Sequence, residues 1–130
     1  MVTREIPRDE WAEFFDELSS QDEAALVTVE ALGGDVGDQL VARDLRLQGI
    51  TVEEKGSDRG QIEIMLGDDP VSHIAHVITT PTRVFILETE DGEPQTLQIE
   101  AEDAPTTLVH FRPFSETGIL DGTAGLEDDE

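Results

Sequence analysis

The sequence predicts an α+β fold. One N-terminal amphipathic helix is expected to cover a curved antiparallel meander sheet of about five to seven strands, and a half-open barrel is the alternative if the sheet curves further. Three observations favour this fold. An apolar repeat of helical period occurs near the N-terminus, segments of alternating apolar and polar residues follow it, and short turn sequences separate those segments. No helical pattern of about 10 to 15 residues separates the strand candidates, which argues against a parallel sheet.

Residues 7–20 are predicted to form the helix. Apolar residues at helical spacing lie on one face: Trp11, Phe14, Phe15 and Leu18. Pro7 suits the first helical position, where its missing N–H needs no partner. Since this face carries half of the chain's aromatic residues, which number one Trp and five Phe, we expect the helix to pack on a large apolar surface.

From residue 25 to residue 112 the apolar pattern changes to a period of two, which is typical of strands. The expected extended segments are 25–32, 40–44, 45–52 with a kink at Gly49, 61–66, 73–79, 83–88, 95–101 and 107–112. Asp91-Gly92 predicts a hairpin turn. The helix is expected to pack against apolar residues of these segments, namely Val27, Val29, Ile62, Ile64, Ile86, Leu97 and Ile99.

The domain organisation predicted from length is a single α+β domain over residues 1–115, because 130 residues normally form one domain. Residues 116–130 contain six acidic residues, no basic residue and few large apolar ones. We therefore expect an acidic, disordered C-terminal tail.

The net charge is the strongest compositional signal. Asp and Glu number 31 against 8 Lys and Arg, so the formal net charge is −23. This charge argues against binding to nucleic acid or to an anionic membrane, since both would repel the chain. The acidic residues are spread along the chain, Lys55 is its only lysine and it contains no Asn, which together favour adaptation to high salt. Two alternatives remain, a surface that binds a basic protein and a mimic of DNA.

The absence of Cys excludes a disulfide framework, a thiolate zinc site and a Cys nucleophile, and it favours the reducing cytosol. No apolar run approaches the roughly 18 residues of a membrane span. The first residues reach an acidic helix rather than the apolar stretch of a signal peptide. We therefore expect a cytoplasmic protein.

Three histidines are the candidates for a metal site or a polar catalytic group: His73, His76 and His110. The first two have H-x-x-H spacing, which would place them on the same face of a helix but on opposite faces of a strand. Val77-Ile78-Thr79-Thr80 favours a strand. A catalytic zinc site needs three converging ligands, so we expect no metal site and no cofactor.

Other motifs offer no specific chemistry. Pairs of carboxylates are frequent in so acidic a chain and do not single out an acid–base pair: Glu53-Glu54, Asp68-Asp69 and Glu88 with Glu90. The glycine-rich residues 33–37 lack the lysine of a phosphate-binding loop. These absences favour a non-enzymatic cytosolic binding or accessory module. The alternative is a small enzyme or ligand carrier with a pocket in the curved sheet that uses His73, His76 or His110. A weaker alternative is an acidic DNA mimic, and the oligomeric state stays open.

Several sequence pieces resemble a family of short, single-domain bacterial proteins of unknown function. They are Ile6-Pro7-Arg8-Asp9-Glu10-Trp11 with Phe14-Phe15, Val27-Thr28-Val29-Glu30, Leu32-Gly33, Ile62-Glu63-Ile64, His73-x-x-His76 and Pro81. The resemblance covers roughly residues 4 to 112 and implies a compact single domain. It implies no activity, cofactor or site residue.

Overall fold

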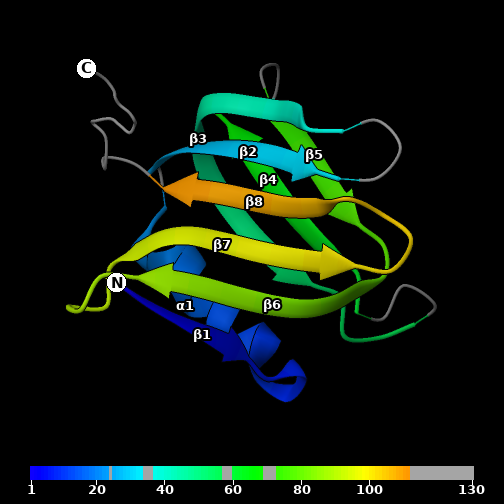
Figure 1. Cartoon of the computed structure of the whole chain (residues 1–130), viewed down its shortest axis with the longest axis horizontal. Coiled ribbons are helices and arrows are strands. Elements are labelled where there is room, and N and C mark those ends of the chain that lie inside the picture. Colours follow the sequence, from blue (N-terminus) through cyan, green and yellow to red (C-terminus); the bar gives the residue numbers. More distant parts are fainter. Residues whose placement is uncertain (24, 34–36, 57–59, 69–72, 112–130) are drawn as a thin grey trace.

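The computed structural model of the chain describes residues 1–23, 25–33, 37–56, 60–68 and 73–111. Within them lie one α-helix and an eight-stranded antiparallel sheet, so the predicted α+β class with an antiparallel sheet is confirmed (Figure 1). The expected number of strands was too low. The expected tail, residues 116–130, lies outside the described residues and stays a prediction.

The sheet is open and follows the order β1-β6-β7-β8-β2-β3-β4-β5, with antiparallel pairing between all neighbours. Its strands are β1 (Val2–Ile6), β2 (Leu26–Leu32), β3 (Gln39–Val52), β4 (Ile62–Gly67), β5 (His73–Ile78), β6 (Pro81–Glu88), β7 (Pro94–Ala101) and β8 (Thr106–Phe111). The end strands β1 and β5 do not pair with each other, so the barrel does not close.

Strand β1 is the element that the sequence pattern did not predict. Its first four residues are exposed and only Ile6 is buried, so it carries too little apolar alternation to be recognised. Its pairing with β6 is reinforced by two ion pairs, from Arg4 to Glu88 at 3.0 Å and from Arg83 to Glu5 at 3.4 Å. A strand of this kind is specified by a partner distant in sequence rather than by its own composition.

The predicted helix is present but shorter than residues 7–20. Arg8–Glu10 form a 3₁₀ turn, and the α-helix α1 spans Trp11–Gln21. The indole Nε1 of Trp11 donates a hydrogen bond to the carbonyl of Ile6 at 3.0 Å, which connects the helix to the end of β1. The Arg8 guanidinium lies over the Trp11 ring, 4.6 Å from its centroid, and stacks on it as a cation–π pair.

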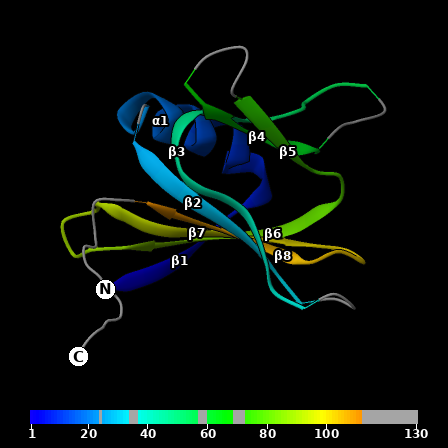
Figure 2. The same cartoon turned by 90° about the horizontal axis from the view of Figure 1, so that it is seen from above.

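Strand β3 has 14 residues and belongs to both parts of the sheet. Its first half pairs with β2, its second half pairs with β4, and its register with β4 shifts between Leu47 and Gly49, where a kink was expected. Beyond this shift the sheet turns over itself. The second half of β3, with β4, β5 and α1, then lies above one face of the larger part of the sheet, as Figure 2 shows.

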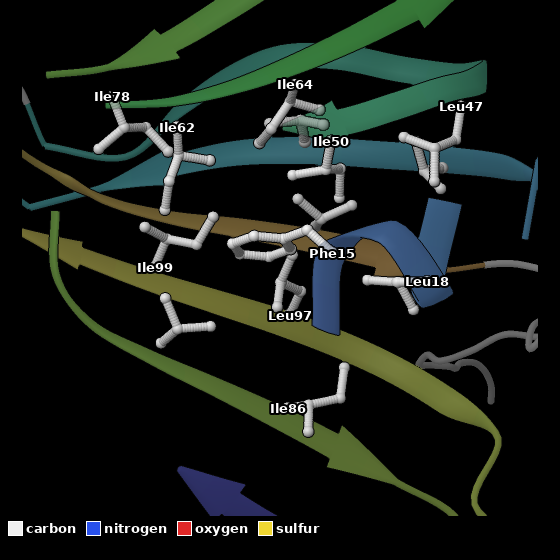
Figure 3. Close-up of a cluster of buried hydrophobic side chains, with 14 of the residues drawn as sticks. Phe15, Leu18, Leu47, Ile50, Ile62, Ile64, Ile78, Ile86, Leu97 and Ile99 are labelled. Atoms are coloured by element: carbon white, nitrogen blue, oxygen red, sulfur yellow. The ribbon is translucent and has the colours of Figure 1, made fainter. Parts of the chain in front are cut away.

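The core fills the space between these two layers. Phe15 has no exposed surface and lies among isoleucines and leucines from both layers (Figure 3). Every residue that the sequence placed in the core is buried except Phe14, which is partly buried and meets the ring of Phe15 edge-on at 5.5 Å. Within the described residues, no helix has the length and apolar character to cross a membrane.

Candidate functional site

The larger part of the sheet has a face that no described helix or strand covers, and we call it the outer face (Figure 1). Directly opposite residues of antiparallel strands point to the same side, so the register defines its rows. One row crosses six strands through Glu5, Phe85, Gln98, Leu108, Glu30 and Leu40. A second row contains Thr3, Leu87, Thr96, His110 and Thr28.

Apolar side chains are partly exposed on this face. Phe85 and Leu87 on β6 and Leu108 on β8 are half-buried, and Leu40 on β3 is 51% exposed. The guanidinium of Arg83 lies 4.9 Å from the centroid of the Phe85 ring. The outer face therefore combines apolar contact area with charged groups, as a typical protein–protein interface does.

Three polar side chains from neighbouring strands are joined by hydrogen bonds on the outer face. The Nε2 of His110 on β8 lies 2.8 Å from Oε1 of Glu30 on β2. The other ring nitrogen, Nδ1, lies 3.3 Å from the hydroxyl of Thr96 on β7. All three side chains are partly buried, which limits competition from water.

The partners of His110 fit one arrangement of hydrogen bonds. A carboxylate can only accept, so this arrangement has the Nε2–H of His110 donating a hydrogen bond to Glu30. In the neutral imidazole, Nδ1 is then an acceptor for the hydroxyl proton of Thr96. In this order, the carboxylate can orient the imidazole so that it acts as a general base toward the hydroxyl.

His76 occupies a different place, on the concave side of the sheet. Its Nε2 lies 3.2 Å from the hydroxyl of Thr107 on β8, which is 2% exposed. Burial lowers the pKa of His76, so the ring is neutral at pH 7. A cavity of about 110 Å³ adjoins it and is lined by Ala31, Val77, Ile78, Thr79, Ala104 and Pro105 as well. This volume is below the roughly 300 Å³ at which cavities for larger ligands begin.

The structure does not bring the three histidines together. The expected strand over His73–Ile78 is confirmed, and an odd spacing on a strand sends His73 and His76 to opposite faces. His73 is exposed, His76 contacts Thr107, and His110 lies on the outer face. Within the described ranges, no three His, Asp or Glu side chains group in a way that could hold a metal ion.

Sequence reasoning missed the partners of these histidines, Glu30, Thr96 and Thr107. Each comes from another strand. The contacts of His110 depend on the register between β7, β8 and β2, whereas the contact of His76 with Thr107 joins β5 to β8, which are not neighbours in the sheet. Thr96 and Glu30 each lie beside buried residues in their own strands, and this alternation indicates only that their side chains face away from the core. No local pattern predicts which strands become neighbours.

The paired carboxylates named from the sequence have separate surroundings. Glu53 and Glu54 line a groove of about 320 Å³ together with Arg8 and Trp11. Glu88 pairs with Arg4, and Asp68 lies 3.1 Å from Arg46. Asp69 lies outside the described residues. Exposed ion pairs such as these contribute at most about 1 kcal/mol each, and ion pairing of this kind does not single out an acid–base pair.

We expect zinc, nickel or cobalt to find no stoichiometric site that depends on His73 and His76, since the two imidazoles point apart. Isothermal titration of the metal-free protein should show only weak binding by surface carboxylates. The variant His76→Ala should give the same titration curve as the parent. A tight 1:1 site that disappears in this variant would contradict the prediction.

Comparisons with known proteins give matches over most of the chain. The family model described as "Family of unknown function (DUF5335)" matches residues 2–118 of the chain. A protein of Aquifex aeolicus described as "Uncharacterized protein" is 26% identical over 113 residues, which cover 87% of this chain and 95% of that protein. No solved structure matches the chain.

Proposed function

Because the chain belongs to the DUF5335 family of unknown function, we propose from its structure that it is a non-enzymatic, cytosolic binding or accessory module that contacts a partner protein through the outer face. The resemblance predicted from the sequence is thereby confirmed. The family assignment carries no activity, so the function is argued from the surface alone.

The observation that supports this proposal is a row in which partly exposed apolar side chains alternate with polar ones, on a sheet face that no described helix or strand covers. Leu108 is at its centre, between Gln98 of β7 and Glu30 of β2, and Phe85 and Leu40 lie further along the same row. Partly exposed apolar residues on every second strand, with polar residues between them, provide a mixed contact patch. Carboxylates at Glu5, Glu30 and Glu100 add negative charge to it.

The chemistry of this patch favours a partner with apolar anchors and basic residues around them. Oppositely charged surfaces accelerate association and select against wrong partners, whereas the apolar centre contributes the affinity. The net charge of −23 disfavours partners that are themselves acidic. We interpret the remaining acidic residues as a halophile-type surface that keeps the protein soluble in concentrated salt.

The proposal is tested with Leu108→Glu, which places a charge at the centre of the patch. A partner purified from cell extract with the parent protein should bind it directly in solution. Leu108→Glu should raise the dissociation constant at least about tenfold, equivalent to about 1.4 kcal/mol. Thr51→Glu is the matched control because it introduces the same charge at an exposed residue in the second half of β3, which is not part of the outer face. Equal weakening by both variants would contradict an interface on the outer face.

The alternative of a small enzyme is favoured by one specific observation, the hydrogen-bonded chain of Glu30, His110 and Thr96. His110 would act as the general base that accepts a proton from the hydroxyl or from a water molecule beside it. A model ester such as 4-nitrophenyl acetate provides a direct assay. This alternative predicts that the protein hydrolyses the ester faster than buffer alone and that both His110→Gln and Glu30→Gln lose this activity. Equal rates for the parent and the two variants would contradict the enzyme and favour the binding module.

A further inference from the structure

The two ends of the sheet differ in the way that their edges are protected. An edge strand presents unpaired N–H and C=O groups that can pair with another strand, and charged residues usually prevent this. Edge strand β1 carries Arg4 and Glu5, both in ion pairs with β6. Edge strand β5 has the sequence His-Ile-Ala-His-Val-Ile and contains no Asp, Glu, Lys or Arg.

This absence of charge is unusual within the described strands. Charged residues make up 30% of the chain, and only β5 and β8 among its eight described strands lack them. Strand β8 lies between β7 and β2, so both of its edges are already paired. Strand β5 pairs with β4 alone, and Ile74 and Val77 on its two faces are 38% and 42% exposed. An uncharged, partly apolar edge of this kind is suited to strand addition.

Residues 74–78 of β5 are also close to symmetric about His76. Read in either direction from His76, the strand presents a small or β-branched aliphatic residue and then an isoleucine: Ala75 and Ile74 on one side, Val77 and Ile78 on the other. An antiparallel strand pair centred on His76 places Ile74 of each copy opposite Ile78 of the other, and Ala75 opposite Val77. Every cross-strand pair beside the central histidines is then aliphatic.

We propose that β5 is a dimerisation edge, at which it pairs antiparallel with β5 of a second copy of this chain about a twofold axis at His76. A twofold interface requires a surface that is complementary to itself, and the near-palindromic strand meets that requirement. The pairing continues the eight-stranded sheet of one copy into that of the other. This inference is independent of the outer face.

A second copy fits this edge better than an unrelated peptide because both halves of the strand supply matching side chains. The charge of the chain opposes the association, since two copies of −23 repel at low salt. The dimer should therefore be weak at 0.1 M KCl and stronger at 1 M, where the screening length falls from about 10 Å to about 3 Å.

The experiment is sedimentation equilibrium of the full chain at 1 M KCl over a wide range of protein concentration. We expect a monomer–dimer equilibrium whose dissociation constant rises at least about tenfold in Val77→Lys. Val2→Lys is the matched control, because Val2 is 50% exposed on the other edge strand, and it should change the constant by less than about twofold. Circular dichroism should show that both variants stay folded.

A double variant tests the register. Ala75→Glu alone should also weaken the dimer, but Ala75→Glu combined with Val77→Lys places opposite charges across the twofold axis in both pairs. The double variant should therefore bind more tightly than either single variant. A chain that stays monomeric at every concentration at 1 M KCl, a dimer that is sensitive to Val2→Lys but not to Val77→Lys, or a double variant weaker than both single ones would overturn the proposal.

Discussion

Replacing Trp11 by alanine should lower the free energy of unfolding by about 3 to 5 kcal/mol, as expected for truncation of a large buried aromatic side chain. Trp11 is 2% exposed, and its indole connects α1 to β1 through the hydrogen bond to the Ile6 carbonyl. The variant removes the packing and the donor together, and it leaves the Arg8 guanidinium without the ring on which it stacks. The loss is a large share of the roughly 5 to 15 kcal/mol that stabilises a typical domain.

Two matched variants separate the contributions. Trp11→Phe keeps most of the ring but loses the N–H donor, which should cost about 1 kcal/mol for the hydrogen bond in addition to a smaller packing loss. Phe14→Ala on the same helix should cost less than Trp11→Ala, because Phe14 is only partly buried. Urea denaturation gives the three values. Coincident midpoints for Trp11→Ala and the parent would show that the helix is not docked as described.

The melting temperature should climb steadily between 0.1 M and 1 M potassium chloride and continue to rise above it. With a net charge of −23, the compact state is destabilised by repulsion that the unfolded chain relieves by spreading its charges. Salt shortens the screening length from about 10 Å to about 3 Å over this range and removes most of that repulsion. A rise of at least about 5 °C, close to 1 kcal/mol, is expected in calorimetry.

One surface variant identifies the source of this effect. Glu13 is exposed on α1 between Glu10 and Glu17, one turn away on either side. Glu13→Gln should raise the melting temperature at 0.1 M and make little difference at 1 M. Sulfate at equal ionic strength measures the salting-out of the core, which acts on both proteins alike. Stability that is flat or falling from 0.1 M to 1 M chloride would instead favour a partner-binding role for the acidic surface.

The parts of the fold that sequence predicted are those that a local pattern specifies. The apolar face of α1 and the alternation in β4 and β7 identify buried residues such as Phe15, Ile64 and Leu97 correctly. Strand β1 was missed because it has little apolar alternation of its own and pairs with β6, a strand about 80 positions away whose contacts include ion pairs between residues 78 and 84 positions apart. The two expected segments 40–44 and 45–52 form a single strand, β3. This continuity could not be predicted locally because it depends on pairing with both neighbouring strands, β2 and β4.

The candidate sites were less predictable than the fold for the same reason. His73, His76 and His110 could be named as the chain's histidines, and strand geometry separated the first two. The hydrogen-bond partners of two of them come from other strands, Thr107 for His76 and both Glu30 and Thr96 for His110. Such contacts follow from topology, which no short segment encodes.

The pairing of β1 with β6 has a consequence for the order of events during synthesis. Strand β1 is synthesised before the other described elements, yet the described strand that pairs with it, β6, begins at Pro81 and itself pairs with β7. Non-local contacts form late because closing a long loop costs entropy before the contacts reward it. We therefore expect the N-terminal strand to be among the last parts to dock, because a nascent chain that ends before residue 81 lacks the strand that pairs with β1.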